Sequence, residues 1–189
     1  MKKIILASKS PRRLEIMRNH GIEPIVLPSN TDEKLPDKID MEEAVKMLAL
    51  QKAKSTYDMI KDDEQYNNCL IIGADTIVYK NEILGKPYDY NDAVRMLKMI
   101  RGTSHYVATG VAIIDTANGN SNILCDVTEV HCIDFSDDDI HKYIVDEQPF
   151  DKAGSYAIQG SFRKYIEKIE GDYENVVGLP FYRIESFLK

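Results

Sequence analysis

The segment Ser8-Lys9-Ser10-Pro11-Arg12-Arg13 places two arginines where a helix is expected to begin. Ser10 is a favourable N-cap, and the proline after it suits the first helical position, so Arg12 and Arg13 would lie in the first turn. Helix N-termini bind anions, and an arginine there opposes the helix dipole unless an anion is bound. Bidentate contacts to a polyphosphate would offset that repulsion. The alternative is a solvated charged turn, because the segment lacks the glycines of a P-loop.

Asp75 is the second candidate, in the segment Gly73-Ala74-Asp75-Thr76. It interrupts an apolar run over residues 70–78, which is typical of a strand buried on both faces. A carboxylate in such a strand must be paired or must bind a metal to stay charged. Hard Mg²⁺ prefers such a ligand, so we expect a functional aspartate; a structural salt bridge or an exposed strand end is the alternative.

Three further charged residues are weaker candidates. Lys52 falls on the inward face of a predicted helix, where a lysine either snorkels outward or points into a cleft. Lys86 lies in Gly85-Lys86-Pro87, where glycine permits close approach and proline stiffens the turn. Glu33 has no periodic context, and each of these residues taken alone is ordinarily solvated surface.

Gln159 offers both a hydrogen-bond donor and an acceptor in a glycine-flanked segment, residues 153–160. It could read the edge of a base, and the alternative is an ordinary turn. Together, two arginines, two lysines, a buried carboxylate and no convincing nucleophile indicate phosphate chemistry through positioning and charge stabilisation.

The elements that must position these residues alternate early in the chain and pair as strands later. The predicted strands cover residues 3–7, 70–78, 83–87, 106–114 and 123–135, and the predicted helices begin near residues 11, 41, 89, 136 and 181. Capping residues support three of these starts, namely Ser10, Asp40 with Glu43, and Ser136 with Asp139. The pattern predicts an α/β fold with a mixed sheet.

Composition limits the functional classes. The 189 residues suit a single domain, residues 1–189, with no linker, and the 43% hydrophobic content supports a sizeable core. The net charge of −7 opposes stable binding to DNA or RNA but leaves room for a small phosphorylated ligand at a local cluster of cations.

Cysteines, histidines and hydropathy point to the cytoplasm. The three cysteines have no CxxC spacing, which fits free thiols in a reducing compartment, and the four histidines show no familiar metal-ligand spacing. The apolar run at residues 4–7 is too short for a signal peptide, and no stretch is long enough to span a membrane, so no membrane association is expected.

At these residues the sequence resembles the Maf family of nucleotide pyrophosphatases along nearly the whole chain. The ordered set of similar segments is Leu6–Arg13, Glu33, Lys52, Gly73–Thr76, Gly85–Pro87, Asp151–Gly154, Ile158–Gly160 and Val176–Pro180. The resemblance implies cleavage of a nucleoside triphosphate between the α and β phosphates, with Mg²⁺ or Mn²⁺ as cofactor. It also implies a two-lobed fold like that of inosine triphosphatases, with an elongated mixed sheet, a central cleft and, in many members, a homodimer.

Residue roles follow from the same resemblance. Asp75 matches the proposed proton acceptor, which orients or deprotonates the attacking water or holds the metal. Glu33 matches an acidic position that helps with metal or water, so Asp75 and Glu33 are the expected metal ligands. The expected phosphate-binding cations are Arg12, Arg13, Lys52 and Lys86. Lys52 and Lys86 are also expected to be catalytic residues, together with Asp75 and Glu33. Ser8 and Ser10 are expected to bind substrate.

Substrate preference depends on three positions. In the branch that hydrolyses dTTP and UTP these are the first arginine of SPRR, the threonine after the aspartate and the glutamine of IQG, here Arg12, Thr76 and Gln159. The branch that hydrolyses 7-methyl-GTP differs at all three and is the alternative. A second alternative is a nucleotide-binding regulator of septum formation and cell division, a role to which family members have been linked.

Overall fold

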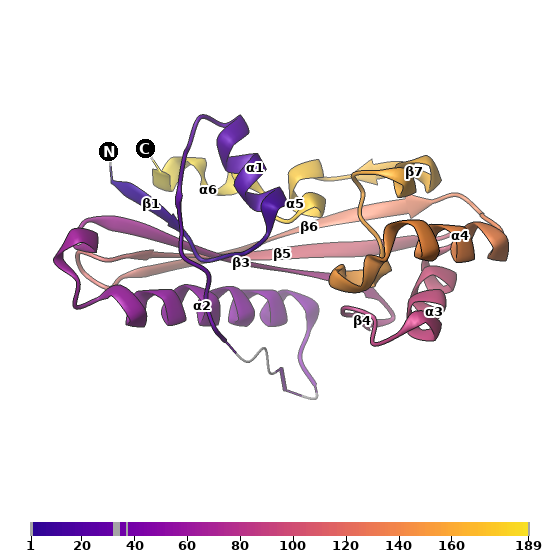
Figure 1. The fold of residues 1–189 in the computed structure, drawn as a ribbon, viewed down its shortest axis with the longest axis horizontal. Helices are drawn as coiled ribbons and strands as arrows, with labels where there is room; N and C mark the ends of the chain where they lie inside the picture. Colours follow the sequence, from indigo (N-terminus) through magenta and orange to yellow (C-terminus); the bar gives the residue numbers. More distant parts are fainter. Residues whose placement is uncertain (1, 32–34, 37, 189) are drawn as a thin grey trace. The chain divides into compact units, whose positions relative to one another are not determined.

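The computed structural model describes residues 2–31, 35, 36 and 38–188, and its elements form an α/β fold (Figure 1). The strands are β1 Lys3–Leu6, β2 Ile25–Val26, β3 Cys69–Lys80, β4 Glu82–Leu84, β5 Ser104–Asp115, β6 Ser121–Cys132 and β7 Ile166–Glu170. The α-helices are α1 Pro11–Asn19, α2 Met41–Ile60, α3 Tyr90–Ile100, α4 Asp137–Glu147, α5 Tyr173–Val177 and α6 Phe181–Leu188. Short 3₁₀ turns lie at Glu64–Tyr66, Pro149–Asp151, Ala153–Ser155 and Ser161–Tyr165.

The strands form one mixed sheet in the order β2-β1-β3-β5-β6-β7, with β4 paired to β3. β1 is parallel to both β2 and β3, whereas β3–β4 and β6–β7 are antiparallel. The mixed sheet and the flanking helices confirm the predicted fold class.

Contacts divide the chain into two compact units, and β3, β5 and β6 contribute residues to both. Unit 1 comprises Met1–Asp75, Thr109–Asp126 and Gly178–Lys189, and unit 2 comprises Thr76–Ala108 and Val127–Val177. No described helix is long and apolar enough to cross a membrane.

In unit 1, α2 covers one face of the strands, and α1 and α6 lie on the other (Figure 1). The rings of His20, after α1, and Phe181, in α6, stack with centroids 3.8 Å apart. On the α2 side the buried core includes Ile5, Ile71 and Ala112 from the strands and small residues from the helix.

Two glycines bring α2 close to the sheet. A Cβ added at Gly73 of β3 would lie 2.4 Å from the Ala49 carbonyl oxygen, and one at Gly110 of β5 would lie 2.3 Å from that of Val45. Real Cβ atoms do not approach backbone this closely, so only glycine permits this spacing. Residues on the inward face of α2 therefore lie directly over β3 and β5.

Unit 2 is built around aromatic side chains. Phe162 is fully buried, and its ring contacts those of Phe135, Tyr143, Tyr156 and Tyr165 at centroid distances of 4.8–5.7 Å. These rings come from the segment after β6, from α4 and from the loops before β7, so they join residues 135–165 of unit 2 into one core.

His105 of β5 is buried beside this cluster. Its Nε2 lies 2.7 Å from the hydroxyl oxygen of Tyr156. Burial, aided by the charge of Lys80 and the proximity of His131, lowers the pKa of His105 to about 3. The imidazole is therefore neutral at neutral pH.

Most predicted elements are confirmed, with ends shifted by a few residues. The Asp40 side chain accepts a hydrogen bond from the Glu43 N–H at the start of α2, and Ser136 with Asp139 forms a complete capping box at α4. Ser10 occupies the N-cap position of α1 without making a side-chain capping bond. The strands β2 and β7 and the short helix α5 were not predicted.

Candidate functional site

Arg13 organises the turn between β1 and α1 in unit 1. It is only 8% exposed. Its Nη1 donates to Ser8 Oγ at 3.1 Å and its Nε to the Gly178 carbonyl oxygen at 2.7 Å. Ser8 Oγ also accepts from the Ser10 N–H at 3.2 Å. The guanidinium thus fixes the turn against the segment before α6, while Arg12 and Ser10 are half-buried.

Lys52 and Asp75 form a buried ion pair in the same unit. Lys52 Nζ donates to Asp75 Oδ1, and the residues are 9% and 8% exposed. Lys52 lies between Ala49 and Ala53, the two α2 residues that approach Gly73, which explains how a lysine on an inward helix face reaches a strand carboxylate. Lys52 therefore points inward, and the charge of Asp75 is matched.

The turn and the ion pair lie at the same level of the sheet. β1 and β3 are parallel, Leu6 is opposite Ile72, and the Ala7 N–H donates to the Ile72 carbonyl oxygen at 2.8 Å. Ser8 follows Leu6 by two residues and Asp75 follows Ile72 by three, so both lie just beyond the paired stretch. Ligands in α/β sheets commonly bind beyond the carboxyl end of a parallel strand. Here β1 ends at Leu6 while β3 continues to Lys80, and the position beyond β1 combines a helix N-terminus, cations and the Asp75 carboxylate.

Unit 2 holds the other predicted residues. Lys86 is exposed in the loop after β4. That loop is joined to residues 153–155 because the Gly154 N–H donates to the Gly85 carbonyl oxygen at 3.0 Å. Gly154 has φ 67°, and a Cβ there would lie 2.9 Å from Val78 side-chain atoms, so the position requires glycine. Thr76 and Gln159 are half-buried.

Glu33 lies outside the described residues, so its predicted role with the metal remains a prediction. Asp75 by itself fits a hard cation, because a buried carboxylate is the ligand type that Mg²⁺ and Mn²⁺ prefer.

The structure adds a contact that the sequence does not predict. The Gly178 carbonyl oxygen accepts from Arg13, although the two residues lie far apart in sequence. The only sequence signal was Gly178's place in Val176–Pro180, a segment to which no role was given. Lys152, two residues before Gly154, is a further half-buried cation of unit 2. Its Nζ lies 2.6 Å from Asp151 Oδ1.

Comparison with known families decides the relationship. The family model described as "Maf-like protein" matches residues 3–189. The chain belongs to the Maf family. The Maf relatives named dTTP/UTP pyrophosphatase include a protein of Alkaliphilus oremlandii, 43% identical over 189 residues that cover 100% of this chain and 96% of the relative. Those of Caldicellulosiruptor bescii and Acetivibrio thermocellus are each 42% identical, covering 100% of this chain and 94% and 95% of their own.

Among solved structures, the Ham1 protein of Staphylococcus aureus is similar to this Maf chain over 69% of the chain and 72% of its own length. The TM-score is 0.47 and the sequence identity 10%.

Proposed function

We propose that this protein hydrolyses dTTP and UTP at the bond between the α and β phosphates, releasing the nucleoside monophosphate and pyrophosphate. The observation that carries the proposal is the buried Lys52–Asp75 pair, level with the Ser8–Arg13 turn on adjacent parallel strands. Full-length relatives named dTTP/UTP pyrophosphatase support the same reaction and the same pyrimidine nucleotides.

The cations of the site would hold the triphosphate. Arg12, at the start of α1, and the N–H groups of that helix offer positive charge to phosphate oxygens. Arg13 keeps this turn in shape through Ser8 and Gly178 and adds its own charge. Lys52 and Lys86 supply two further ammonium groups, which offset charge on the oxygens as the pyrophosphate leaves.

Asp75 would act on the water. Its carboxylate orients or deprotonates a water molecule whose oxygen bonds to the α-phosphorus while the bond from that phosphorus to the bridging oxygen breaks. Lys52 donates to the carboxylate and holds it in place. Mg²⁺ or Mn²⁺ bound by Asp75 and Glu33 would supply the positive charge that two protein carboxylates cannot give.

Substrate selection would rest on Arg12, Thr76 and Gln159. Gln159 carries a donor and an acceptor on one amide, which suits the donor and acceptor edge of uracil or thymine. The relatives' names support this pyrimidine preference over 7-methyl-GTP.

The decisive experiment is a panel of nucleotides incubated with the purified protein and Mg²⁺ or Mn²⁺. The panel contains dTTP, UTP, CTP and 7-methyl-GTP, and both pyrophosphate and monophosphate are measured. We expect dTTP and UTP to be turned over fastest, with activity lost in Asp75→Asn and kept in Asp58→Asn, an exposed carboxylate on α2. Binding without turnover would contradict the enzyme and favour a regulator, and faster cleavage of 7-methyl-GTP would contradict the substrate.

The cellular setting is part of the proposal. We place the enzyme in the cytoplasm as a homodimer, on the basis of the family resemblance and of its free cysteines. Burial raises the pKa of Cys125 to about 11 and that of Cys132 to about 12, so both remain thiols rather than reactive thiolates. Sedimentation analysis of the purified protein checks the oligomeric state.

A further inference from the structure

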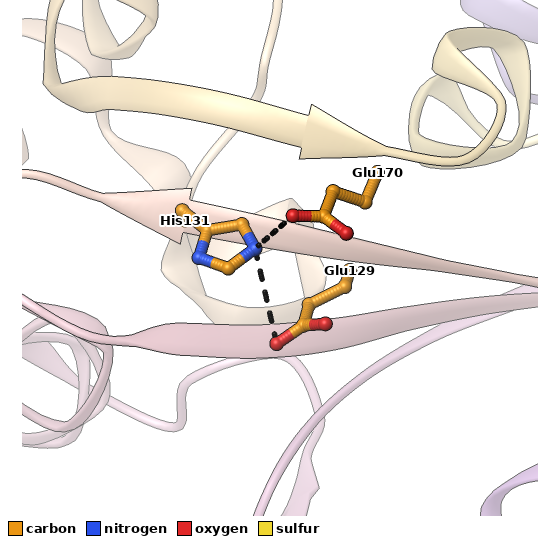
Figure 2. A group of neighbouring side chains, drawn as sticks. All are labelled: Glu129, His131 and Glu170. Carbon is orange, nitrogen blue, oxygen red and sulfur yellow. Dashed lines mark ion pairs between the residues drawn. The ribbon is translucent and has the colours of Figure 1, made fainter.

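Three metal-ligating side chains meet on one face of the β6–β7 pair in unit 2. Glu129 and His131 are two residues apart on β6, so their side chains share a face. Antiparallel pairing places Glu170 of β7 opposite Glu129, and Lys168 opposite His131. Figure 2 shows the imidazole with its Nε2 directed towards both carboxylates, each joined to it by an ion pair. None of these residues has a part in the proposed hydrolysis.

The arrangement gathers negative charge at one point of the strand pair. Like charges directly opposite one another destabilise a strand pair, and here two glutamates are opposite. His131 Nε2 is shielded from solvent and makes no hydrogen bond within the described chain. A buried polar nitrogen without such a bond costs free energy. Glu129 and Glu170 lie within ion-pair distance of this nitrogen, so a cation shared by the three groups would stabilise all of them.

The distances suit a small divalent ion. His131 Nε2 lies 3.4 Å from Glu170 Oε1 and 3.9 Å from Glu129 Oε1, and the three ligand atoms lie within 4.8 Å of one another. A tetrahedral ion with bonds of about 2.1 Å keeps its ligand atoms about 3.4 Å apart. Small side-chain rotations would therefore bring all three atoms into range.

We propose that Glu129, His131 and Glu170 form a second metal site, which binds Zn²⁺ or a similar divalent transition-metal ion. The imidazole nitrogen favours this class over Mg²⁺ and Ca²⁺, which take oxygen ligands. Three protein ligands leave a fourth position for water. The bound ion joins β6 to the end of β7 and neutralises the opposed glutamates.

Lys168 is the natural competitor for the ion. Its Nζ lies 2.5 Å from Glu170 Oε1, and it lowers the pKa of that carboxyl. The Lys168 side chain is 62% exposed, so it can turn into solvent when the metal binds. Removing this ammonium group should therefore tighten metal binding, an effect that adventitious binding elsewhere would not produce.

The test is calorimetric titration of Zn²⁺ into the full-length protein. Every protein carries Asp75→Asn, so that any ion at the catalytic carboxylate contributes equally. His131→Asn should remove one binding event or weaken it more than about 100-fold, beyond the usual effect of changing a residue that only supports a ligand. His141→Asn, which changes an exposed imidazole on α4, is the matched control and should bind as the parent does.

Two further variants keep the test decisive. Glu170→Gln should weaken Zn²⁺ binding, and Lys168→Gln should strengthen it several-fold. Thermal unfolding without metal checks that each variant folds, and added Zn²⁺ should raise the Tm of the parent but not that of His131→Asn. Equal Zn²⁺ affinity and stoichiometry in the parent and His131→Asn, or no binding by the parent, would overturn the proposal.

Discussion

Arg13 and Lys52 are the most deeply buried arginine and lysine of the described chain. Each side chain donates hydrogen bonds to polar partners inside the protein. Arg13 uses the fixed fork of its guanidinium to contact Ser8 and Gly178, whereas Lys52 places a single ammonium group on Asp75. A substitution of Arg13 therefore removes a specific hydrogen-bond geometry, whereas a substitution of Lys52 removes the positive charge that balances Asp75.

Arg13→Lys should lower both stability and activity although it keeps the charge. One ammonium group cannot donate to Ser8 Oγ and the Gly178 carbonyl oxygen with the same geometry, so a buried acceptor loses its partner, at a cost of about 1–3 kcal/mol. We expect kcat/KM for dTTP to fall about 10- to 100-fold. Arg18→Lys, which alters an exposed arginine of the same helix, should match the wild type in urea unfolding and turnover.

Lys52→Met should be strongly destabilising, by about 3–5 kcal/mol, because it leaves the buried carboxylate of Asp75 without its ion-pair partner. Adding Asp75→Asn should relieve this defect, because it removes the unpaired carboxylate. The double variant Lys52→Met with Asp75→Asn should therefore lose about 1–3 kcal/mol less stability than the sum of the two single losses. Urea unfolding of the four proteins measures this coupling. Purely additive losses would show that the ion pair contributes no interaction energy, and the double variant should in any case be inactive.

At the scale of elements, the approach of α2 to β3 determines where Lys52 lies. Ala49 and Ala53 flank it on the helix and contact the position where Gly73 lacks a side chain. Side-chain chemistry at the site thus depends on a backbone contact between residues that take no part in the reaction.

Gly73→Ala should push α2 away from the strand. The new methyl group would lie 2.4 Å from the Ala49 carbonyl oxygen and 2.6 Å from the Ala53 nitrogen, both backbone atoms that cannot rotate aside. We expect a loss of about 1–3 kcal/mol or more together with reduced turnover, since Lys52 moves with the helix. Gly85→Ala has open space around it and serves as the stability control in the same denaturation series. Unchanged stability in Gly73→Ala would show that α2 adjusts freely.

The elements that the sequence predicts are those with local signals. α2, α3 and α4 begin at side chains that cap them, and β3 is a long apolar run. β7 carries no such signal, because Ile166 and Ile169 are three residues apart with charged residues between them, which breaks the two-residue period of a strand. β2 is two residues long, and only pairing with β1 makes it a strand.

At the scale of the whole molecule, the candidate site depends on pairings that the sequence does not contain. Asp75 and Lys52 could each be singled out, one as a carboxylate in an apolar strand and the other as a lysine on an inward helix face. Their ion pair requires the position of α2 over β3, and the metal-ligand group requires the β6–β7 register. Both are tertiary features, set by packing over many residues.

The stability of the whole molecule should depend on pH through His105. Burial lowers its pKa to about 3 in the folded protein, from an ordinary value of 6.5, so between these values the unfolded chain binds a proton that the folded chain does not. Stability is therefore fully present above pH 6.5 and falls as the pH drops, by up to about 1.4 kcal/mol per pH unit.

Urea unfolding of the wild type and His105→Gln at pH 7, 6 and 5 isolates this contribution. The variant is expected to be less stable at pH 7, because it loses the contact with Tyr156, but its stability should decline less steeply as the pH falls. Asp139, whose pKa is lowered to about 2 by hydrogen bonds from Ser136 and Tyr165, titrates below this range and is present in both proteins. Parallel pH slopes would show that His105 takes up its proton without unfolding and that the core around Tyr156 accommodates the charge.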